Sequence, residues 1–327
     1  MKHVAKKIQR RLEDAKTVLI VMHQNPDGDT LGSSMAMFEY IKRINTDKPI
    51  EITVFSLTKL PQNLDFLPNI HIVTQNKEVL SVKYDVAIIL DSGDLGYAGV
   101  EEILKNKPKT IINIDHHKTN KFYGDLNMVD ENAASTTEIL YHFFKFNNLH
   151  INPKQATCLL TGLITDTDNF TNSATTTTAV MIAGELVRLG ANLPNINTKT
   201  IKNKTVNSLK LWGTALSRLK KHPEMDLAHT HLTQADFKKH GVEEDMADGI
   251  SNFLNNLEEA KIALVLKETN DGKIKGSLRT THDDVDVSKI AQSFGGGGHK
   301  KAAGFTSENS IDEILKQISQ VYKKTQI

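Results

Sequence analysis

The amino-acid sequence predicts an α/β protein with a mostly parallel N-terminal sheet, helices on both faces of that sheet, and a smaller C-terminal α/β domain. Three apolar runs, 18–22, 84–90 and 110–114, are rich in β-branched residues, as strands buried on both faces are. Helix-like segments separate these runs, and such alternation is typical of parallel strands joined by helical crossovers. The second half mixes shorter strands and helices, which indicates a separate unit.

Each element of the first domain has a local signal for its start or end. Pro26 and Gly28 break the first apolar run, and the apolar spacing that follows predicts a helix over 30–44. The first fifteen residues are charged and helix-like, and the segment around Pro61 is a loop. We expect further strands at 50–56, 84–90 and 110–114, and helices at 97–106, 135–147, 153–164 and 179–189.

The second half begins after a polar connection. Residues 190–204 contain glycine and proline, which favours a link between domains. We expect a first domain at 1–190, a linker with a connecting helix at 191–222, and a second domain at 223–327. In and beyond the linker, we expect helices at 205–221, 233–239, 243–257 and 311–323 and strands at 226–232, 261–267 and 273–279.

Composition limits the classes of function. The chain has 327 residues and a formal net charge of +1, so it lacks the basic field that would hold long duplex nucleic acid. Its single cysteine, Cys158, excludes an internal disulfide and favours a reducing, cytoplasmic location. No apolar run reaches the length of a signal peptide or a membrane span. The sequence leaves open whether the protein is a homodimer.

Acidic and histidine residues follow the three buried-type strands. Because parallel strands end at one edge of a sheet, we expect these side chains to converge there. An alternative reading is that aspartate and asparagine only cap helices and turns at these places. That reading explains one such strand ending better than three. The candidate residues are His23, Asp27, Asp29, Asp91, Asp115, His116, His117 and, after a helix, Asp166.

Crowded carboxylates of this kind need cations. Burying several of them unpaired costs several kcal/mol each, and divalent ions remove that cost. The number of ligands fits two ions that share one carboxylate, an arrangement that can clamp a phosphoryl group for in-line attack. Mixed imidazole and carboxylate ligands without thiolate favour Mn²⁺ over Mg²⁺, while Zn²⁺ and Fe²⁺ stay open alternatives.

The motifs resemble those of a known family. HQNPDGD at 23–29, DSGD at 91–94, DHH at 115–117 and TDT at 165–167 are similar to the four motifs of the DHH phosphoesterase superfamily. GGGGHKKAAG at 295–304, with Arg279 upstream, resembles the DHH-associated C-terminal domain. The resemblance covers nearly the whole chain, and the spacing is similar to that of the short nanoRNase/pAp phosphatase subfamily. It implies an active site in the cleft between the two domains.

The resemblance also implies a role for each site residue. One Mn²⁺ would be held by His23, Asp27 and Asp91. The other would be held by Asp29, Asp91, His116 and Asp166, with Asp91 bridging. Among the catalytic candidates beside Asp91, Asp115 would orient a neighbouring histidine, and His117 would face the substrate phosphate and protonate the leaving oxygen. Substrate would be bound by Arg279, His299, Gly296, Gly297 and Gly298. Asp168 stands where the family pattern has glycine.

The function expected from this resemblance is a manganese-dependent phosphoesterase. It would degrade very short oligoribonucleotides to mononucleotides and dephosphorylate adenosine 3′,5′-bisphosphate (pAp), through attack by a hydroxide held between two metals. A phosphodiesterase for cyclic di-AMP or its linear product pApA is the alternative within the same class, because the motifs do not separate these substrates. A nucleotide sensor without turnover would be expected to have lost a metal ligand, and none is missing.

Overall fold

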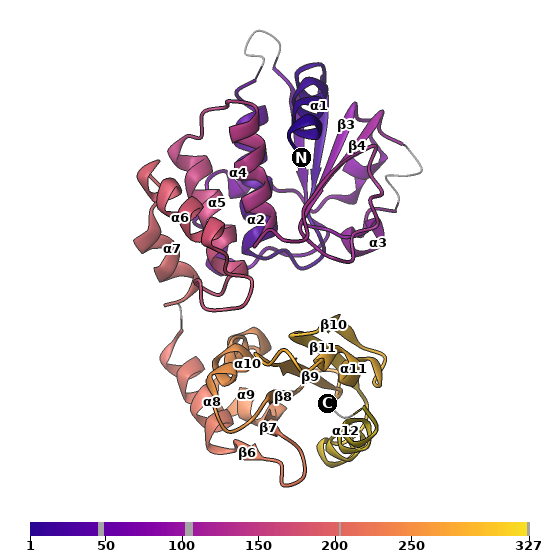
Figure 1. Ribbon diagram of the computed structural model, residues 1–327, viewed down its shortest axis with the longest axis vertical. Coiled ribbons are helices and arrows are strands. Elements are labelled where there is room, and N and C mark those ends of the chain that lie inside the picture. The colour runs from indigo at the N-terminus through magenta and orange to yellow at the C-terminus, as the bar shows by residue number, and fades with distance from the viewer. Residues whose placement is uncertain (45–48, 102–106, 203, 326–327) are drawn as a thin grey trace. The chain divides into compact units, whose positions relative to one another are not determined.

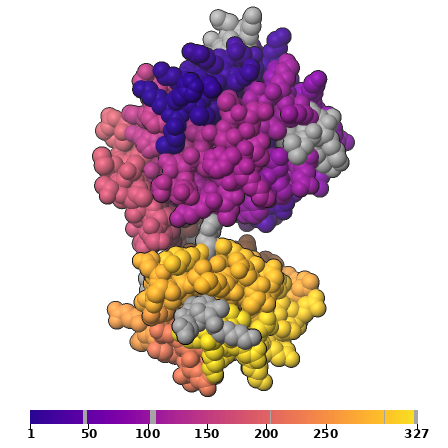
Figure 2. Space-filling view, turned by 45° about the vertical axis from the view of Figure 1, so that its right-hand side comes forward, coloured from indigo at the N-terminus to yellow at the C-terminus, as the bar shows by residue number. Residues whose placement is uncertain are grey.

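The computed structural model describes residues 1–44, 49–101, 107–202 and 204–325, and it divides into two compact units (Figures 1 and 2). Unit 1 covers Met1–Asn203 and unit 2 covers Lys204–Ile327. The boundary falls within the segment 191–222 that was expected to link the domains. The first helix of this segment packs against unit 1 and the second packs against unit 2.

Unit 1 is built on a five-stranded parallel sheet with the strand order β2-β1-β3-β4-β5. This order places β1 between β2 and β3, so the chain goes from β1 to β2 on one side and then from β3 to β5 on the other. Ligands of open α/β sheets bind at such a reversal point, beyond the carboxyl ends of the strands. The strands are β1 Thr17–Val21, β2 Glu51–Phe55, β3 Val86–Leu90, β4 Thr110–Asp115 and β5 Leu126–Val129.

Helices cover the two faces of this sheet unequally. The larger cluster of apolar side chains lies between the sheet and the helices drawn beside it in Figure 1. The other face is covered by α3 (Leu95–Ala98), the short 3₁₀ helix Lys77–Ser81 and nearby loops. The helices on the first face are α1 Lys2–Glu13, α2 Gly28–Ile41, α4 Thr136–Phe146, α5 Pro153–Asp166, α6 Thr177–Arg188 and α7 Leu193–Thr200. Two more 3₁₀ turns, Gln62–Leu64 and Ile70–Ile72, pack beside them.

Helices α2 and α5 approach each other closely because glycines face the contact. A Cβ on Gly32 would collide with the backbone carbonyl of Cys158, and a Cβ on Gly28 would collide with the side chain of Thr165. This close packing places the start of α2 beside the end of α5. Residues that the sequence separates by more than a hundred positions therefore meet at one place.

Unit 2 is a six-stranded mixed sheet with the order β10-β11-β9-β8-β7-β6. Only the β7–β8 pair is parallel. One face packs against α11 (Val287–Gln292) and α12 (Ile311–Thr325), and the other packs against α8 (Val206–Ser217), α9 (Gln234–His240) and α10 (Ile250–Phe253). The strands are β6 Lys220–Lys221, β7 Leu227–Leu232, β8 Ile262–Glu268, β9 Ile274–Arg279, β10 Gly297–His299 and β11 Ala302–Ser307.

The fold class predicted from the sequence is confirmed, but two helix predictions are wrong. The helix expected over 97–106 is the single turn α3, which ends at Gly99 with φ +68°, and residues 102–106 lie outside the described part of the chain. The helix expected over 243–257 is split into α10 and two 3₁₀ turns, Glu244–Ala247 and Leu254–Asn256. The break is at Gly249, with φ +94°. A left-handed glycine ends α3 at Gly99, whereas at Gly249 a left-handed glycine directly precedes α10 and separates it from the 3₁₀ turn before it.

Over the described residues, we find no helix that combines the length and apolar character needed to span a membrane.

Two glycine substitutions should change stability in opposite directions. Gly32→Ala adds a Cβ against the Cys158 carbonyl and should lower the free energy of unfolding by about 1–3 kcal/mol. Gly184→Ala, in α6, meets nothing within 4 Å and should raise it by roughly 0.5–1 kcal/mol, the ordinary helix-propensity gain. Thermal unfolding of both variants checks this. If the thermal midpoints of the two variants shifted equally, the α2–α5 contact would be able to accommodate the added Cβ.

Candidate metal centre

The turn after β1 supplies the first three site residues. His23 is buried, and its Nδ1 donates to the Gln24 carbonyl at 2.6 Å, which leaves Nε2 directed toward two carboxylates. Nε2 lies 3.8 Å from Asp27 Oδ1 and 3.4 Å from Asp91 Oδ2. Asp27 also caps α2, since Oδ1 accepts from the amides of Asp29 and Thr30 at 3.0 Å. The capping role considered from the sequence is therefore real and coexists with the contact to His23.

Asp91 lies at the centre of the site, directly after β3. Its backbone has φ +58°, a left-handed conformation that aspartate tolerates better than most residues. The carboxylate is 3 % exposed, and it accepts hydrogen bonds from Thr30 Oγ1 at 2.6 Å and Thr136 Oγ1 at 3.0 Å. One threonine lies on each oxygen, so the carboxylate is held at both ends.

Asp29 is fixed by the start of α4. Its two oxygens accept from the amides of Thr136 at 2.7 Å and Thr137 at 2.9 Å, and its side chain is fully buried. Unpaired amides at a helix start are natural partners for a carboxylate, because they carry the positive end of the helix dipole.

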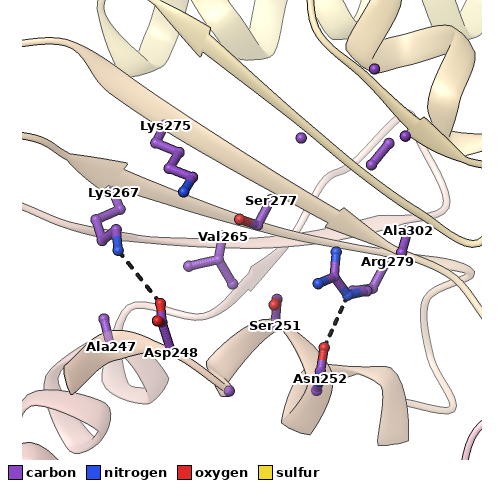
Figure 3. Close-up of a pocket in the computed structure, with 15 residues that line it drawn as sticks. Ala247, Asp248, Ser251, Asn252, Val265, Lys267, Lys275, Ser277, Arg279 and Ala302 are labelled. Carbon is purple, nitrogen blue, oxygen red and sulfur yellow. Dashed lines mark hydrogen bonds and ion pairs between the residues drawn. The ribbon is translucent and has the colours of Figure 1, made fainter. Parts of the chain in front are cut away.

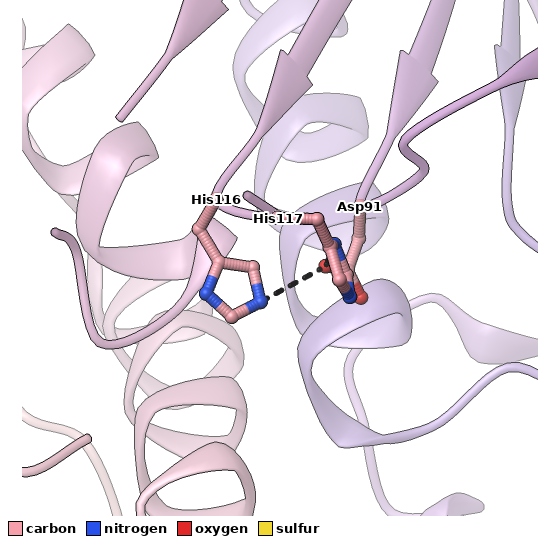
Figure 4. Close-up of side chains that lie close together, drawn as sticks. All are labelled: Asp91, His116 and His117. Atoms are coloured by element: carbon pink, nitrogen blue, oxygen red, sulfur yellow. Dashed lines mark ion pairs between the residues drawn. The ribbon is translucent and has the colours of Figure 1, made fainter. Parts of the chain in front are cut away.

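His116 connects the end of β4 to the end of α5. Its Nε2 lies 3.6 Å from Asp91 Oδ1, the contact drawn as a dashed line in Figure 4, and 3.2 Å from Asp166 Oδ2. Its other nitrogen, Nδ1, lies 3.4 Å from the Ala133 carbonyl. The ring is thus placed so that Nε2 faces both carboxylates.

Asp115 orients His117. The buried carboxylate receives a hydrogen bond from His117 Nδ1 at 2.7 Å, and Asn120 donates to its second oxygen at 2.5 Å. His117 Nδ1 also lies 3.7 Å from Asp91, and Figure 4 shows the His117 ring beside that carboxylate. The His117 ring is thus held by Asp115, which is not a member of the candidate metal-binding groups.

The structure brings all six predicted metal-ligating residues of unit 1 together. They form two groups of three residues, and within each group the ligand atoms lie within 4.8 Å of one another. A third group of the same kind consists of Asp91, His116 and His117. Imidazole and carboxylate donors in this number and spacing could hold divalent cations. The two groups are His23, Asp27 and Asp91, and Asp29, His116 and Asp166.

The electrostatics of the metal-free site also indicate a cation. Burial, followed by the negative charges of Asp29 and Asp27, raises the pKa of Asp166 well above its usual range. Burial, together with Asp91, does the same for Asp29. Although burial opposes it, Asp91 raises the pKa of His23 to about 9. The carboxylates repel one another, and a bound cation would remove that repulsion.

The predicted substrate-binding residues lie in unit 2. Arg279, at the end of β9, donates through Nε to Asn252 Oδ1 at 2.9 Å. Packing inside the protein requires glycine at positions 296 and 298, because a Cβ on Gly296 or Gly298 would collide with the backbone of β11. A Cβ on Gly297 would meet nothing within 4 Å. The backbone of His299 pairs with Ala302, and the side chain of His299 lies outside the described part of the chain.

Asp168 occupies a backbone position that suits glycine. It has φ +48°, and the next two residues also have positive φ. Aspartate is among the few residues with a side chain that adopt this conformation readily, so it can stand where the resemblance led us to expect glycine.

Four residues of the site were missed in the sequence. The hydroxyls of Thr30 and Thr136 and the amide of Thr137 fix the carboxylates, and Asn120 holds Asp115. The spacing of Ser135 and Glu138 is a capping signal for the start of α4. Nothing in that signal shows that the amides of α4 bind a residue as distant as Asp29.

Comparison with known families agrees with this arrangement. The N-terminal domain of the DHH family matches residues 17–163, and the DHHA1 domain matches residues 227–324. The chain therefore contains a DHH domain followed by a DHHA1 domain. The first match contains five of the six predicted metal-ligating residues, and the second contains Arg279 and the glycine run.

Several curated relatives are similar to this chain over most of its length. The bifunctional oligoribonuclease and PAP phosphatase NrnA of Thermus thermophilus is 28% identical, over 94% of this chain and 89% of the relative. The NrnA of Bacillus subtilis is 23% identical over 94% and 95%. Cyclic-di-AMP phosphodiesterase PdeA of Listeria monocytogenes is 22% identical, but only 48% of its length is covered. A solved exopolyphosphatase-related protein from Bacteroides fragilis has the same fold, with a TM-score of 0.90, 23% identity and coverage of 99% and 96%.

The metal-free protein should lose stability as the pH rises. The raised pKa of His23 and that of His117, also about 9, stabilise the fold below about pH 6.5, and this contribution is lost between there and about pH 9. The raised carboxyl pKa values act in the same direction. A divalent cation at a hundred times its Kd should restore about 2.7 kcal/mol.

The measurement is the thermal midpoint in EDTA and in MnCl₂ across this pH range. A midpoint that does not respond to Mn²⁺ at pH 8 would contradict a metal site here.

Proposed function

We propose that this protein is a manganese-dependent phosphoesterase that cleaves very short oligoribonucleotides to mononucleotides and removes the 3′-phosphate of pAp. The observation that carries the proposal is the convergence of two ligand groups around Asp91, at the reversal point of the sheet. The NrnA relatives, which match this chain over nearly its whole length, support the choice of substrates.

In this proposal, His23, Asp27 and Asp91 hold one Mn²⁺, and Asp29, Asp91, His116 and Asp166 hold the other. Two such ions, when bound, supply a hydroxide nucleophile and neutralise the charge that develops on the phosphoryl oxygens. Asp91 is suited to sharing because each of its oxygens faces a different histidine, His23 through Oδ2 and His116 through Oδ1. Thr30 and Thr136 keep both oxygens in place.

His117 supplies the proton for the leaving oxygen. Although burial opposes it, the hydrogen bond to Asp115 raises the pKa of His117 to about 9 when no metal is bound, so this contact favours the protonated ring. Its Nδ1 is engaged by Asp115, so proton exchange with a phosphate ester would pass through Nε2. Asp115 is a positioning residue that fixes the direction of the ring.

Unit 2 binds the nucleotide. Arg279 projects into a cavity of about 530 Å³, a size usual for small-molecule sites. A guanidinium is well suited to a phosphate because it donates two parallel hydrogen bonds. In this proposal the metal residues of unit 1 carry out the chemistry and unit 2 selects the substrate.

The similarity to PdeA supports an alternative substrate, which is cyclic di-AMP or its linear product pApA. A panel of pAp, pApA, cyclic di-AMP and RNA of two, five and twenty-four nucleotides separates the two. The proposal expects fast turnover of pAp and the dinucleotide and little of the 24-mer. Preference for cyclic di-AMP would establish the alternative, and binding without turnover would indicate a sensor.

Replacing Asp91 by Asn should lower turnover of pAp and of bis-p-nitrophenyl phosphate by orders of magnitude. The change removes the negative charge that both ligand groups face, while the amide keeps the shape of the side chain. Activity, metal content and circular dichroism are measured together, with the exposed Asp65→Asn as a matched control. An Asp91→Asn variant with two bound ions and a normal rate would refute the bridging role.

Arg279→Ala should weaken turnover of pAp and dinucleotides by about 10- to 150-fold in kcat/KM, the value of a charge-assisted hydrogen bond. Bis-p-nitrophenyl phosphate, which has no second phosphate, should be affected far less. The ratio of the two losses is the measurement, and Arg279→Lys should recover part of the lost activity. Equal losses for both substrates would mean that unit 2 shapes the metal site instead of binding the nucleotide.

A further inference from the structure

The cavity of unit 2 extends well beyond Arg279. It lies on the face of the sheet where α8, α9 and α10 pack against β7 and β8, and its floor continues over β9 and β11. One wall is formed by the segment from Asp248 to Asn252, whose labelled side chains are seen in Figure 3. The cavity is therefore an elongated recess along β9, with Arg279 at one end.

A second cationic group lies at the other end. Lys275 precedes Arg279 by four residues on β9, so their side chains point to the same face, with Ser277 between them. Their Cα atoms are about 13–14 Å apart at the usual rise of a strand. In Figure 3 the Lys275 ammonium and the Arg279 guanidinium lie at separate ends of the recess. A single phosphate would not bridge them.

The Lys275 end carries excess positive charge. Lys267 on β8 is the direct cross-strand partner of Lys275, and like charges in this position destabilise a sheet. Asp248 lies 3.6 Å from Lys267 Nζ, which also donates to the Glu244 carbonyl at 3.0 Å. Within the described part of the chain, Asp248 is the only carboxylate that lines the cavity, against three cationic side chains. An anion would relieve this imbalance.

The floor between the two ends is open. Gly304 lies opposite Ser277 on β11 and also pairs with Gly297 on β10, and neither glycine has a side chain to fill the space. A Cβ on Gly297 would meet nothing within 4 Å, so its absence serves no packing need inside the protein. The recess can therefore accept a chain that runs from one end to the other.

We propose that the Lys275 end of this recess is a second phosphate subsite. It binds a phosphate farther along an oligonucleotide of which another, non-adjacent phosphate is held by Arg279. This inference rests on the proposed function and refines its substrate class. Oligoribonucleotides of three or more residues gain affinity from the second subsite, whereas pAp is too short to reach it.

The test compares Lys275→Ala, Lys275→Glu and the control Lys273→Ala in the full-length protein. Lys273 is a nearby lysine that pairs with Glu308 and Asp271 outside the recess. Lys275→Ala should lower kcat/KM for a tetranucleotide by about three- to tenfold, the value of a partly exposed charge contact, and leave pAp unchanged. Lys275→Glu should lower it further, because a glutamate there pairs with Lys267 and repels phosphate.

Binding supplies a readout that does not depend on turnover. The Kd of a fluorescent tetranucleotide is measured in EDTA at several salt concentrations. The slope of log K against log salt should fall by about 0.7 in Lys275→Ala, the value for one phosphate contact on a single strand. Thermal midpoints of the two Lys275 variants should not fall, because each substitution removes the like-charge pair with Lys267.

Each outcome bears on one proposal. A wild-type protein without activity on any oligonucleotide refutes the proposed function, while the binding measurement still decides the role of Lys275. Unchanged tetranucleotide affinity in Lys275→Ala overturns the second subsite. Equal losses for pAp and the tetranucleotide, or a loss that Lys273→Ala shares, overturn it as well.

Discussion

The site in unit 1 depends on the repulsion among carboxylates that are gathered around Asp91. Asp29 and Asp166 have raised pKa values because burial and neighbouring negative charges disfavour their ionised forms. The fold holds them together with directional contacts from the protein itself. Asp29 is held by the amides of α4, and Asp91 by two threonine hydroxyls. The protein thus maintains an arrangement that it cannot fully neutralise by itself.

The geometry of the sheet explains why this arrangement can form. In the strand order β2-β1-β3-β4-β5, the strands β1, β3 and β4 are neighbours, so the residues that follow them lie side by side at one edge of the sheet. The glycine-mediated contact between α2 and α5 then brings Asp166 to the same edge, although it follows a helix. The sheet topology therefore gathers the residues that follow the strands, and the packing of α2 against α5 adds Asp166.

Much of this site could be predicted from the sequence. The apolar runs that form β1, β3 and β4 are each followed by acidic or histidine residues. These residues could be predicted to meet because parallel strands end at the same edge of the sheet. Contacts made by backbone amides, such as those of Thr136 and Thr137 to Asp29, carry no residue signature and were missed. The strands β5 and β10 were missed for another reason. Their segments, LNMV and GGH, are short and weak in strand propensity, so pairing with neighbours determines their conformation.

The contact between Asp29 and the start of α4 has a consequence for how the protein folds. It joins residues 107 positions apart in the chain, and the candidate metal ligands as a whole extend from His23 to Asp166. Contacts between such distant residues form late, because closing the intervening loops costs entropy before it brings any gain. A ribosome must therefore release most of unit 1 before the complete candidate metal site can form. Cation binding would then stabilise the finished domain and not its early intermediates, so depriving the cell of metal should leave the rate of folding unchanged and speed unfolding.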